Sequence, residues 1–321
     1  MTTSEAAGPA VVVAEVGASA IRGALVDAGG SMVATKEGIT PRSSADDLLQ
    51  AIATMLGRLR DAAARDGYSV RAVGVAGSGS VDERRGVVHR SANLVWRDTP
   101  VVPFLEQRLQ LPAVLLQDAR AAALGEALVG AGRGREDFLY TVLGEGVGSA
   151  VILGGRPLVG RHGSAGEIGH IRVTEGGVHC GCGGRGCVET LASASALTRR
   201  YVLARGQVVS VTEIIKRAEG GEAAAQTIWK EAIATLGTAL AAAVAVLDCD
   251  LVVLGGELVE AAGAVLIRAL GAELEGRLSV VPVPELRTAA LGDSAGRLGA
   301  AGAAFERAGM GRGFRTTESL L

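Results

Sequence analysis

The stretch "GEIGHIRVTEGGVHCGCGGRGCVET", residues 166–190, carries three of the four cysteines of the chain and two of its four histidines. Cys180, Cys182 and Cys187 are separated mainly by glycines, which supply the tight turns that a compact metal site requires. Clustered thiols in a reducing compartment favour a metal site or catalysis over disulfides. The spacing therefore predicts a metal site, and the alternative is a flexible glycine-rich loop with free thiols.

Three thiolates need one more ligand to complete a tetrahedral zinc site. His179 is adjacent to Cys180, and adjacent side chains rarely converge on one ion, while His89 lies in another segment. His170 lies ten residues before Cys180, on an expected short strand, and a loop could return it over the cysteines. An iron–sulfur cluster normally takes four thiolates, so structural zinc is the favoured ion.

The size and charge of the chain exclude several classes of protein. With 321 residues and 48% apolar composition, the chain is long enough for two lobes with a substantial core. The net charge of −2 comes with no basic block suited to nucleic acid or a membrane surface. The start lacks the pattern of a signal peptide, and the longest apolar run, 236–247, is too short to span a bilayer. We expect a cytoplasmic protein without nucleic-acid or membrane partners.

Short apolar segments alternate with helical patterns, which is typical of the α/β class. Strands are expected at 10–16, 21–27, 31–37, 71–80, 113–117, 138–144, 149–155, 250–256, 279–283 and 287–291. Helices are expected at 44–65, 118–130, in parts of 195–247, at 257–274 and at 294–308. Residues 156–194 form a loop-rich insertion that contains the cysteines.

A strand, glycine turn, strand pattern at residues 10–30 recurs at residues 138–155. Two similar halves fit two related α/β lobes that face a cleft. The expected division is a first lobe at 11–118, joined by the helix at 294–308, and a second lobe at 119–293 that contains the zinc loop 166–190. Residues 1–10 and the tail 309–321 are expected to be disordered.

"GEIGHIRV" followed by "CGCGGRGCVET" resembles the signature of the ROK family, which groups bacterial sugar kinases such as glucokinase with sugar-responsive repressors. The resemblance runs from about residue 11 to 308. It implies an actin- and hexokinase-like fold of two ribonuclease-H-like lobes around a cleft, and a homodimer. It also implies that zinc is held by His170, Cys180, Cys182 and Cys187.

The resemblance places sugar-binding groups at Glu167, Glu189 and His170. Sugar hydroxyls need hydrogen-bond acceptors in rigid positions, which a metal-held loop would provide. The alternative is two solvated surface glutamates, the usual environment of this residue type. The segment "SANLVWRDTPV", residues 91–101, resembles a family loop near the sugar, with Asn93 and Trp96 at matching places. Its alternative is a loop anchored by one buried tryptophan.

"LLQDARAAALGE", residues 115–126, resembles the family segment whose aspartate is the general base. Asp118 follows an apolar strand, and ligands bind at such carboxyl ends in α/β sheets. A carboxylate there could activate a sugar hydroxyl for attack on a phosphate. The alternative role for Asp118 is the N-cap of the next helix, and both roles can coexist. Gln117 replaces the usual asparagine, and we expect it to contact the sugar.

Glycine turns between strands can hold phosphates through their backbone N–H groups. The turn "LGEGVGSA" resembles the family's second phosphate loop through Gly144, Gly146 and Gly148, and Gly255 and Gly256 resemble the adenosine-side turn. The first loop departs from the usual Asp-x-Gly-Gly-Thr-Lys. Glu15 keeps a carboxylate for Mg²⁺, Gly17 and Ser19 remain, Ala18 adds a methyl, and Ala20 removes a cation.

Two functions follow from the resemblance. The first is an ATP-dependent kinase for a hexose or N-acetylhexosamine, with Asp118 as the base, structural Zn²⁺, and Mg²⁺ on the nucleotide. The second is a non-catalytic sugar sensor whose first phosphate loop has degenerated. Only about ten residues precede the first expected strand, so a DNA-binding helix-turn-helix is not expected before it.

Overall fold

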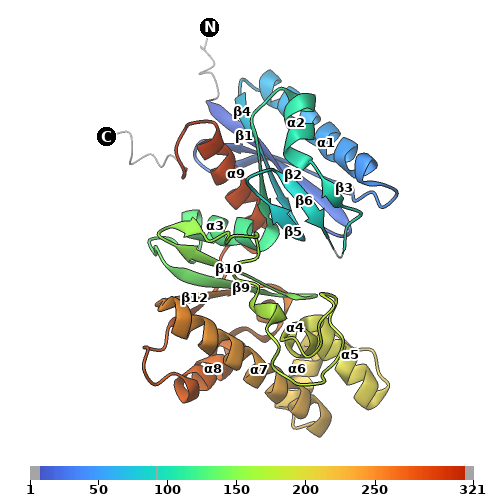
Figure 1. Ribbon diagram of the computed structural model, residues 1–321, viewed down its shortest axis with the longest axis vertical. Coiled ribbons are helices and arrows are strands. Elements are labelled where there is room, and N and C mark those ends of the chain that lie inside the picture. The colour runs from blue at the N-terminus through green and yellow to red at the C-terminus, as the bar shows by residue number, and fades with distance from the viewer. Residues whose placement is uncertain (1–7, 92, 315–321) are drawn as a thin grey trace. The chain divides into compact units, whose positions relative to one another are not determined.

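The computed structural model describes residues 8–91 and 93–314, and its internal contacts divide the chain into two compact units. Unit 1 contains the described residues up to Gly130, the segment Val159–Ser164, and the described residues from Asp293 onward. Unit 2 contains Ala131–Leu158 and Ala165–Gly292. Each unit is built on its own five-stranded sheet (Figure 1).

The sheet of unit 1 has the strand order β3-β2-β1-β4-β8. Its strands are β1 (Pro9–Val16), β2 (Ala20–Asp27), β3 (Met32–Ile39), β4 (Ser69–Gly77) and β8 (Ala113–Gln117). The first three form an antiparallel meander, and β4 and β8 run parallel to β1. A small antiparallel sheet of β5 (Ser80–Asp82), β6 (Val87–Arg90) and β7 (Arg97–Thr99) completes the unit.

Four helices pack in unit 1: α1 (Ala45–Arg65), α2 (Val101–Leu109), α3 (Asp118–Val129) and α9 (Ala295–Arg307). Helix α1 begins as expected, because the Ser44 side chain accepts a hydrogen bond from the N–H of Asp47, and its leucines lie against the sheet. Helices α3 and α9 pack closely because glycine, which has no side chain, lies where they cross. A Cβ on Gly299 would lie 1.8 Å from the carbonyl oxygen of Ala121.

Unit 2 repeats the sheet topology of unit 1. Its strand order is β11-β10-β9-β12-β13, with bounds β9 (Phe138–Leu143), β10 (Val147–Leu153), β11 (Arg156–Pro157), β12 (Leu251–Gly255) and β13 (Glu285–Thr288). Here too the first three strands form an antiparallel meander, and the last two run parallel to the first of them. The short sequence echo between residues 10–30 and 138–155 therefore marks a real structural repeat.

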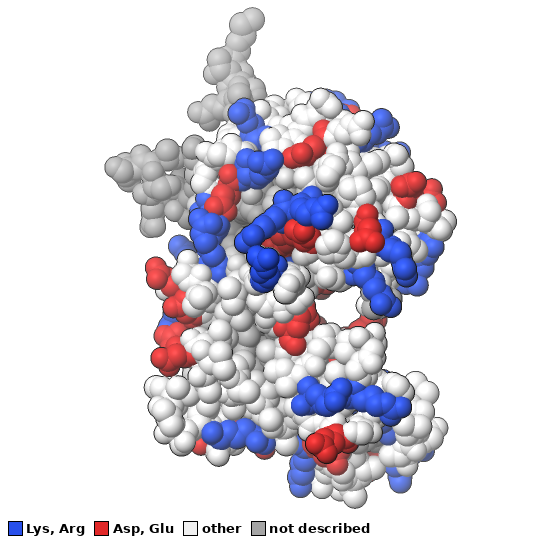
Figure 2. Space-filling model, in the orientation of Figure 1, with Lys and Arg blue, Asp and Glu red and all other residues white. Residues whose placement is uncertain are grey.

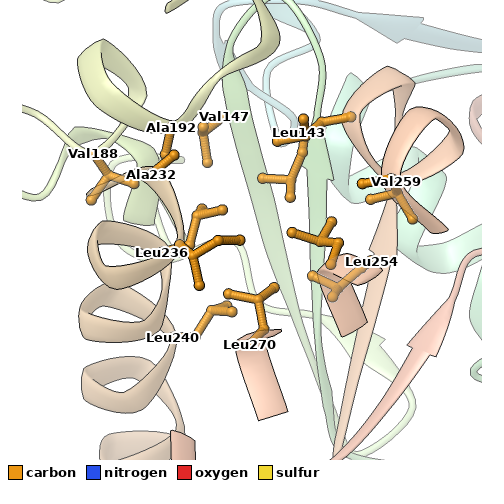
Figure 3. Close-up of a cluster of buried hydrophobic side chains, with 14 of the residues drawn as sticks. Leu143, Val147, Val188, Ala192, Ala232, Leu236, Leu240, Leu254, Val259 and Leu270 are labelled. Carbon is orange, nitrogen blue, oxygen red and sulfur yellow. The ribbon is translucent and has the colours of Figure 1, made fainter. Parts of the chain in front are cut away.

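The helices of unit 2 are α4 (Glu189–Ala192), α5 (Ala194–Arg205), α6 (Val211–Glu219), α7 (Ala223–Leu247) and α8 (Glu257–Arg277). Figure 3 shows their core: Leu236 and Leu240 of α7 and Leu270 of α8 point at Leu143 and Leu254 of the sheet. Val188, between Cys187 and Glu189, is fully buried in the same core. The cysteine loop is thus anchored in the packed interior of unit 2.

Several expectations need correction. The strand expected at 279–283 is absent from the described chain there, and the last strand is β13, so 287–291 contributes only its first two residues. This segment is proline-containing and largely exposed, and apolar composition alone misled the prediction. Helix α2 and the small sheet β5–β7 were not predicted. The predicted division after Asp118 also differs from the structure, where α3 packs on α9 within unit 1.

The disorder expected at both ends lies mostly outside the described residues. Residues 1–7 and 315–321 are not described, while β1 already begins at Pro9.

On the face shown in Figure 2, acidic and basic side chains are interspersed, as the net charge of −2 suggests. Within the described residues, α7 is the one helix with the length and apolar composition to cross a membrane. Half of its most apolar window is buried in unit 2, and core helices pass the same test.

Candidate functional site

A cluster of four potential metal ligands forms the centre of the unit 2 site. One ligand atom each from His170, Cys180, Cys182 and Cys187 lies within 4.8 Å of the other three. Nδ1 of His170 is 3.6 Å from Sγ of Cys180, and Sγ of Cys182 is 3.7 Å from Sγ of Cys187. The structure therefore brings together the four residues that the sequence nominated as zinc ligands.

Local hydrogen bonds fold the loop around this cluster. The N–H of Cys180 donates to the carbonyl of Gly184 at 2.9 Å, and the N–H of Gly183 donates back to Cys180 at 3.0 Å. Gly186 has φ +70° and its backbone lies against Thr174, where a Cβ would be only 1.9 Å from the carbonyl oxygen. His170 ends a 3₁₀ turn, Ile168–His170, rather than the short strand that was expected.

The donor set fits a zinc ion. Burial raises the pKa of the Cys180 thiol to about 12 and also raises the pKa of Cys187, while the N–H of Gly184 lowers the pKa of Cys182. Buried thiols at this spacing resist ionisation without a cation among them, and three thiolates with one imidazole are a preferred zinc ligand set. His179 lies outside the cluster and contacts Arg185 instead.

Glu189 is held directly beside the cluster. Its Oε1 lies 3.6 Å from Sγ of Cys180, and its Oε2 accepts a hydrogen bond of 3.1 Å from the N–H of Val147. Gly146 permits this approach, because a Cβ there would lie 2.4 Å from the same carboxylate. The half-buried Glu189 is therefore an oriented carboxylate, and the alternative of a freely solvated surface glutamate does not describe it.

Glu167 lies on the other side of His170. Its Oε2 is 4.0 Å from Nε2 of the histidine, whose Nδ1 faces the cysteines. The hydroxyl of Ser149 on β10 donates to the carbonyl of Gly166 and accepts from the N–H of Ile168, which fixes the loop to the sheet. One imidazole thus connects the Cys₃His cluster to a second carboxylate.

The two turns nominated for the nucleotide in unit 2 are neighbours. Gly144 and Gly146 form the turn between β9 and β10, and Gly148 lies just inside β10. Gly256, at φ +92°, caps α8, and its Cα lies so close to Leu143 that a Cβ would be 2.7 Å from that carbonyl oxygen. Gly255 ends β12 alongside Val142. The N-terminus of a long helix next to a glycine turn is suited to an anionic group.

Asp118 and Gln117 lie at the end of β8 in unit 1. Gln117 is the N-cap of α3, since its Oε1 accepts the N–H of Arg120 at 3.0 Å, so the capping role suggested for Asp118 was wrong. Asp118 is the first helical residue, half-buried, and its Oδ1 accepts the N–H of its neighbour Ala119 at 2.8 Å. Gln117 is 8% exposed and its Oε1 is taken by the helix, and its contact with a sugar remains a prediction.

The loop nominated as the first phosphate loop lies between β1 and β2 and is held through its carbonyl groups. Thr40 binds the carbonyls of Gly17 and Ser19, and Nη2 of Arg42 donates to the carbonyl of Ala18 at 3.0 Å. Arg42 and Thr40 follow β3 directly, and the sequence analysis did not nominate either. Their only sequence signal was their place after the third strand of the meander.

Glu15 is the strongly perturbed carboxyl of unit 1. Burial raises its pKa from 4.5 to about 7, against the opposing effect of Arg297, whose Nε lies 3.9 Å from Oε2. Neither of these two atoms has a hydrogen-bond partner. Asp118 and Asp293 contribute to raising the pKa of Glu15. Arg297 lies on α9, 282 residues after Glu15, and no signal in the sequence linked it to this loop.

Asn93 and Trp96 have different environments. Asn93 is exposed, whereas Trp96 is buried against Gly77 on β4, with its indole N–H unpaired. The buried tryptophan of the alternative interpretation is therefore correct, but the segment is not all loop, because it contains β7 and the start of α2. Asn93 remains a prediction as a sugar contact.

The sequence profile of the ROK family matches residues 11–306. A glucokinase from Streptomyces coelicolor is 36% identical over 185 residues, which are 58% of this chain and 56% of the relative. The alignment thus spans just over half of that relative's length. The crystal structure of a ROK hexokinase from Thermus thermophilus superimposes with a TM-score of 0.83 at 34% identity, covering 94% of this chain and 100% of that one.

A second solved structure is a ROK family glucokinase from Streptomyces griseus in complex with glucose and AMPPNP. It is 31% identical, with a TM-score of 0.78, and the match covers 92% of this chain and 99% of that one. The fold is therefore the α/β fold of ROK hexokinases, and with a profile match over most of its length this chain belongs to the ROK family.

Proposed function

We propose that this protein is an ATP-dependent kinase that phosphorylates a hexose or N-acetylhexosamine. The observation that carries the proposal is the placement of two carboxylates, Glu167 and Glu189, on either side of a Cys₃His cluster in unit 2. Oriented carboxylates suit the hydroxyls of a sugar, and a binding site needs such rigid support. The Streptomyces griseus relative, crystallised with glucose and an ATP analogue, supports this substrate pair.

Zinc would be held by His170, Cys180, Cys182 and Cys187, and its role would be structural. Four protein ligands leave no open position on a tetrahedral ion. The Nε2 atom of His170 stays on the side of Glu167, so the imidazole can serve the metal through one nitrogen and the sugar through the other. A cytoplasmic location and a homodimer, both expected from the sequence, remain part of this proposal.

In the proposed reaction Asp118 is the general base. Its carboxylate takes the proton of the sugar hydroxyl while the hydroxyl oxygen forms a bond to the γ-phosphorus of ATP. The bond between that phosphorus and the bridging oxygen breaks, and ADP leaves with the electron pair. Mg²⁺ would neutralise charge on the phosphates, and Glu15, at the end of β1 just before the first phosphate loop, is the carboxylate that would hold it.

The second candidate, a sugar sensor without kinase activity, is favoured by one observation. Glu15 has its pKa raised to about 7, so near neutral pH part of the population carries a proton on the carboxyl that should serve Mg²⁺. Ala20 adds no cation to the loop. Against it, Arg297, Arg22 and Arg42 place positive charge around the same loop.

We expect Asp118→Asn to lower kcat for sugar-dependent ADP release by at least about 100-fold, because the amide cannot accept the proton. ADP release is measured with a panel of hexoses and N-acetylhexosamines. The matched control is Asp27→Asn at the end of β2, where the amide keeps the Oδ1 acceptor, and its rates should equal those of the wild type. Sugar binding without ADP release from any sugar would establish the sensor instead.

Freshly purified protein should contain about one equivalent of zinc, and Cys182→Ser should reduce it to less than about half, since removal of one ligand weakens the site. Elemental analysis gives the content. Cys249→Ser is the control, because Cys249 is the one cysteine outside the cluster and its loss should leave the zinc unchanged. Wild-type protein with no bound zinc would refute the metal assignment.

The raised pKa of Glu15 leads to a prediction of how the stability of the fold depends on pH. Its pKa is higher in the folded chain than the ordinary 4.5, so between pH 4.5 and about 7 the folded state binds more protons and the free energy of unfolding falls as pH rises. Glu15→Gln should remove this component, on the order of 3 kcal/mol. Urea unfolding of both proteins at pH 5 and pH 8, without nucleotide, measures it. A difference between them that does not change with pH contradicts the buried carboxyl.

A further inference from the structure

A buried ion pair lies next to Asp118 but does not involve its carboxylate. Nε of Arg120 lies 2.6 Å from Oε1 of Glu83, with side chains that are 1% and 14% exposed. Glu83 follows β5 in the small sheet, and Arg120 lies in the first turn of α3. The pair therefore joins two elements of unit 1 at the position where the proposed base emerges from the sheet.

The same carboxylate oxygen of Glu83 also accepts the backbone N–H of Gln117 at 3.0 Å. The N–H of Arg120 is in turn held by the side chain of Gln117 at 3.0 Å. Residues on both sides of Asp118 are thus fixed to one acceptor, by the main chain before it and by the side chain after it. This arrangement fixes the backbone from which the Asp118 carboxylate projects.

Arg120 has a second attachment. Its Nη1 donates to the carbonyl of Gly163 at 3.0 Å, within the short segment Val159–Ser164 that belongs to unit 1. Gly163, at φ +72°, also lies against β5, where a Cβ would be 2.4 Å from the carbonyl oxygen of Val81. The chain continues from this segment through Gly166 to Glu167. The guanidinium therefore fixes both the base and the chain that leads into the sugar-binding loop.

Stability alone is a poor explanation for this pair. Replacing a buried ion pair by apolar side chains of similar volume is often neutral or stabilising. Nη2 of Arg120 is buried and has no hydrogen-bond partner, which adds a cost. Because the pair costs free energy of folding, its presence is better explained by the geometry that it imposes on the neighbouring backbone.

We propose that Glu83 and Arg120 are positioning residues that hold Asp118 and the segment 159–164 in the arrangement required for phosphoryl transfer. The proposal rests on the kinase function proposed above. Neither residue touches the reacting atoms. Both act through the backbone at Gln117 and Asp118, and small displacements of a catalytic group are known to cost large factors in rate.

The test replaces the pair in two ways. Glu83→Gln removes the charge with little change in shape, and the double variant Glu83→Leu/Arg120→Met replaces the pair by apolar groups. The matched control is Glu106→Gln. Oε1 of Glu106 also accepts a β8 backbone N–H, that of Ala113 at 3.1 Å, and an arginine, Arg307 at 3.3 Å. It serves the opposite end of the same strand.

We expect the double variant to keep its melting temperature within about 3 °C of the wild type but to lose at least about tenfold in kcat, with the KM for ATP changed less than about threefold. Added to Asp118→Asn, it should cost less than about twofold more, because it acts through that residue. Unchanged kcat in the variants, a loss equal to that of Glu106→Gln, or full additivity with Asp118→Asn would overturn the proposal.

Hydrogen exchange provides a readout that does not depend on activity. Amides of residues 117–121 and 159–164 should exchange at least about tenfold faster in Glu83→Gln than in the wild type, while those of unit 2 should not change. Unchanged exchange in both segments would refute the positioning role. If the wild-type protein releases no ADP with any sugar, the kinase proposal fails, and the exchange rates alone then decide this one.

Discussion

The convergence of one imidazole and three thiols within 4.8 Å is the constraint on which the unit 2 site depends. Loop 166–190 has few apolar side chains of its own, and Val188 is its fully buried anchor in the core. The rest of the loop is held in shape by the convergence of these four side chains. Glu189, one residue beyond that anchor, is brought to the β9–β10 turn, and Glu167 is brought to the free side of His170. Without a cation, the thiols would have no reason to converge.

The duplicated sheet topology explains where the remaining groups lie. The two nominated phosphate loops are equivalent turns, each joining the first two strands of its sheet. In both, the carbonyl groups are bound within their own unit: Thr40 and Arg42 serve the first loop, and the N–H of Ala194 serves Gly144 in the second at 2.8 Å. Carbonyls held in this way favour an orientation of the turn that suits an anion rather than a cation.

Local and periodic features were predictable from the sequence. The Ser44 cap, the β8 strand before Asp118 and the repeated meander each follow from residues that are adjacent or evenly spaced. Contacts between distant segments were not predictable. Arg297 reaches Glu15 across most of the chain, and Arg120 reaches Glu83 and Gly163, although nothing in the residue types marks these pairs. The capping role of Gln117 was not predicted either, because glutamine is not among the residue types that usually cap helices.

The central claim is that the metal cluster orients Glu167 and Glu189 for a sugar. Calorimetry of glucose and N-acetylmannosamine binding, before and after removal of zinc with a chelator, tests it directly. The affinity of the protein for the sugar should fall at least about tenfold on chelation, which is the size of effect seen when groups that orient a site are lost. It should be restored by added zinc but not by added magnesium. Equal affinity in the metal-free and metal-loaded proteins would contradict the account.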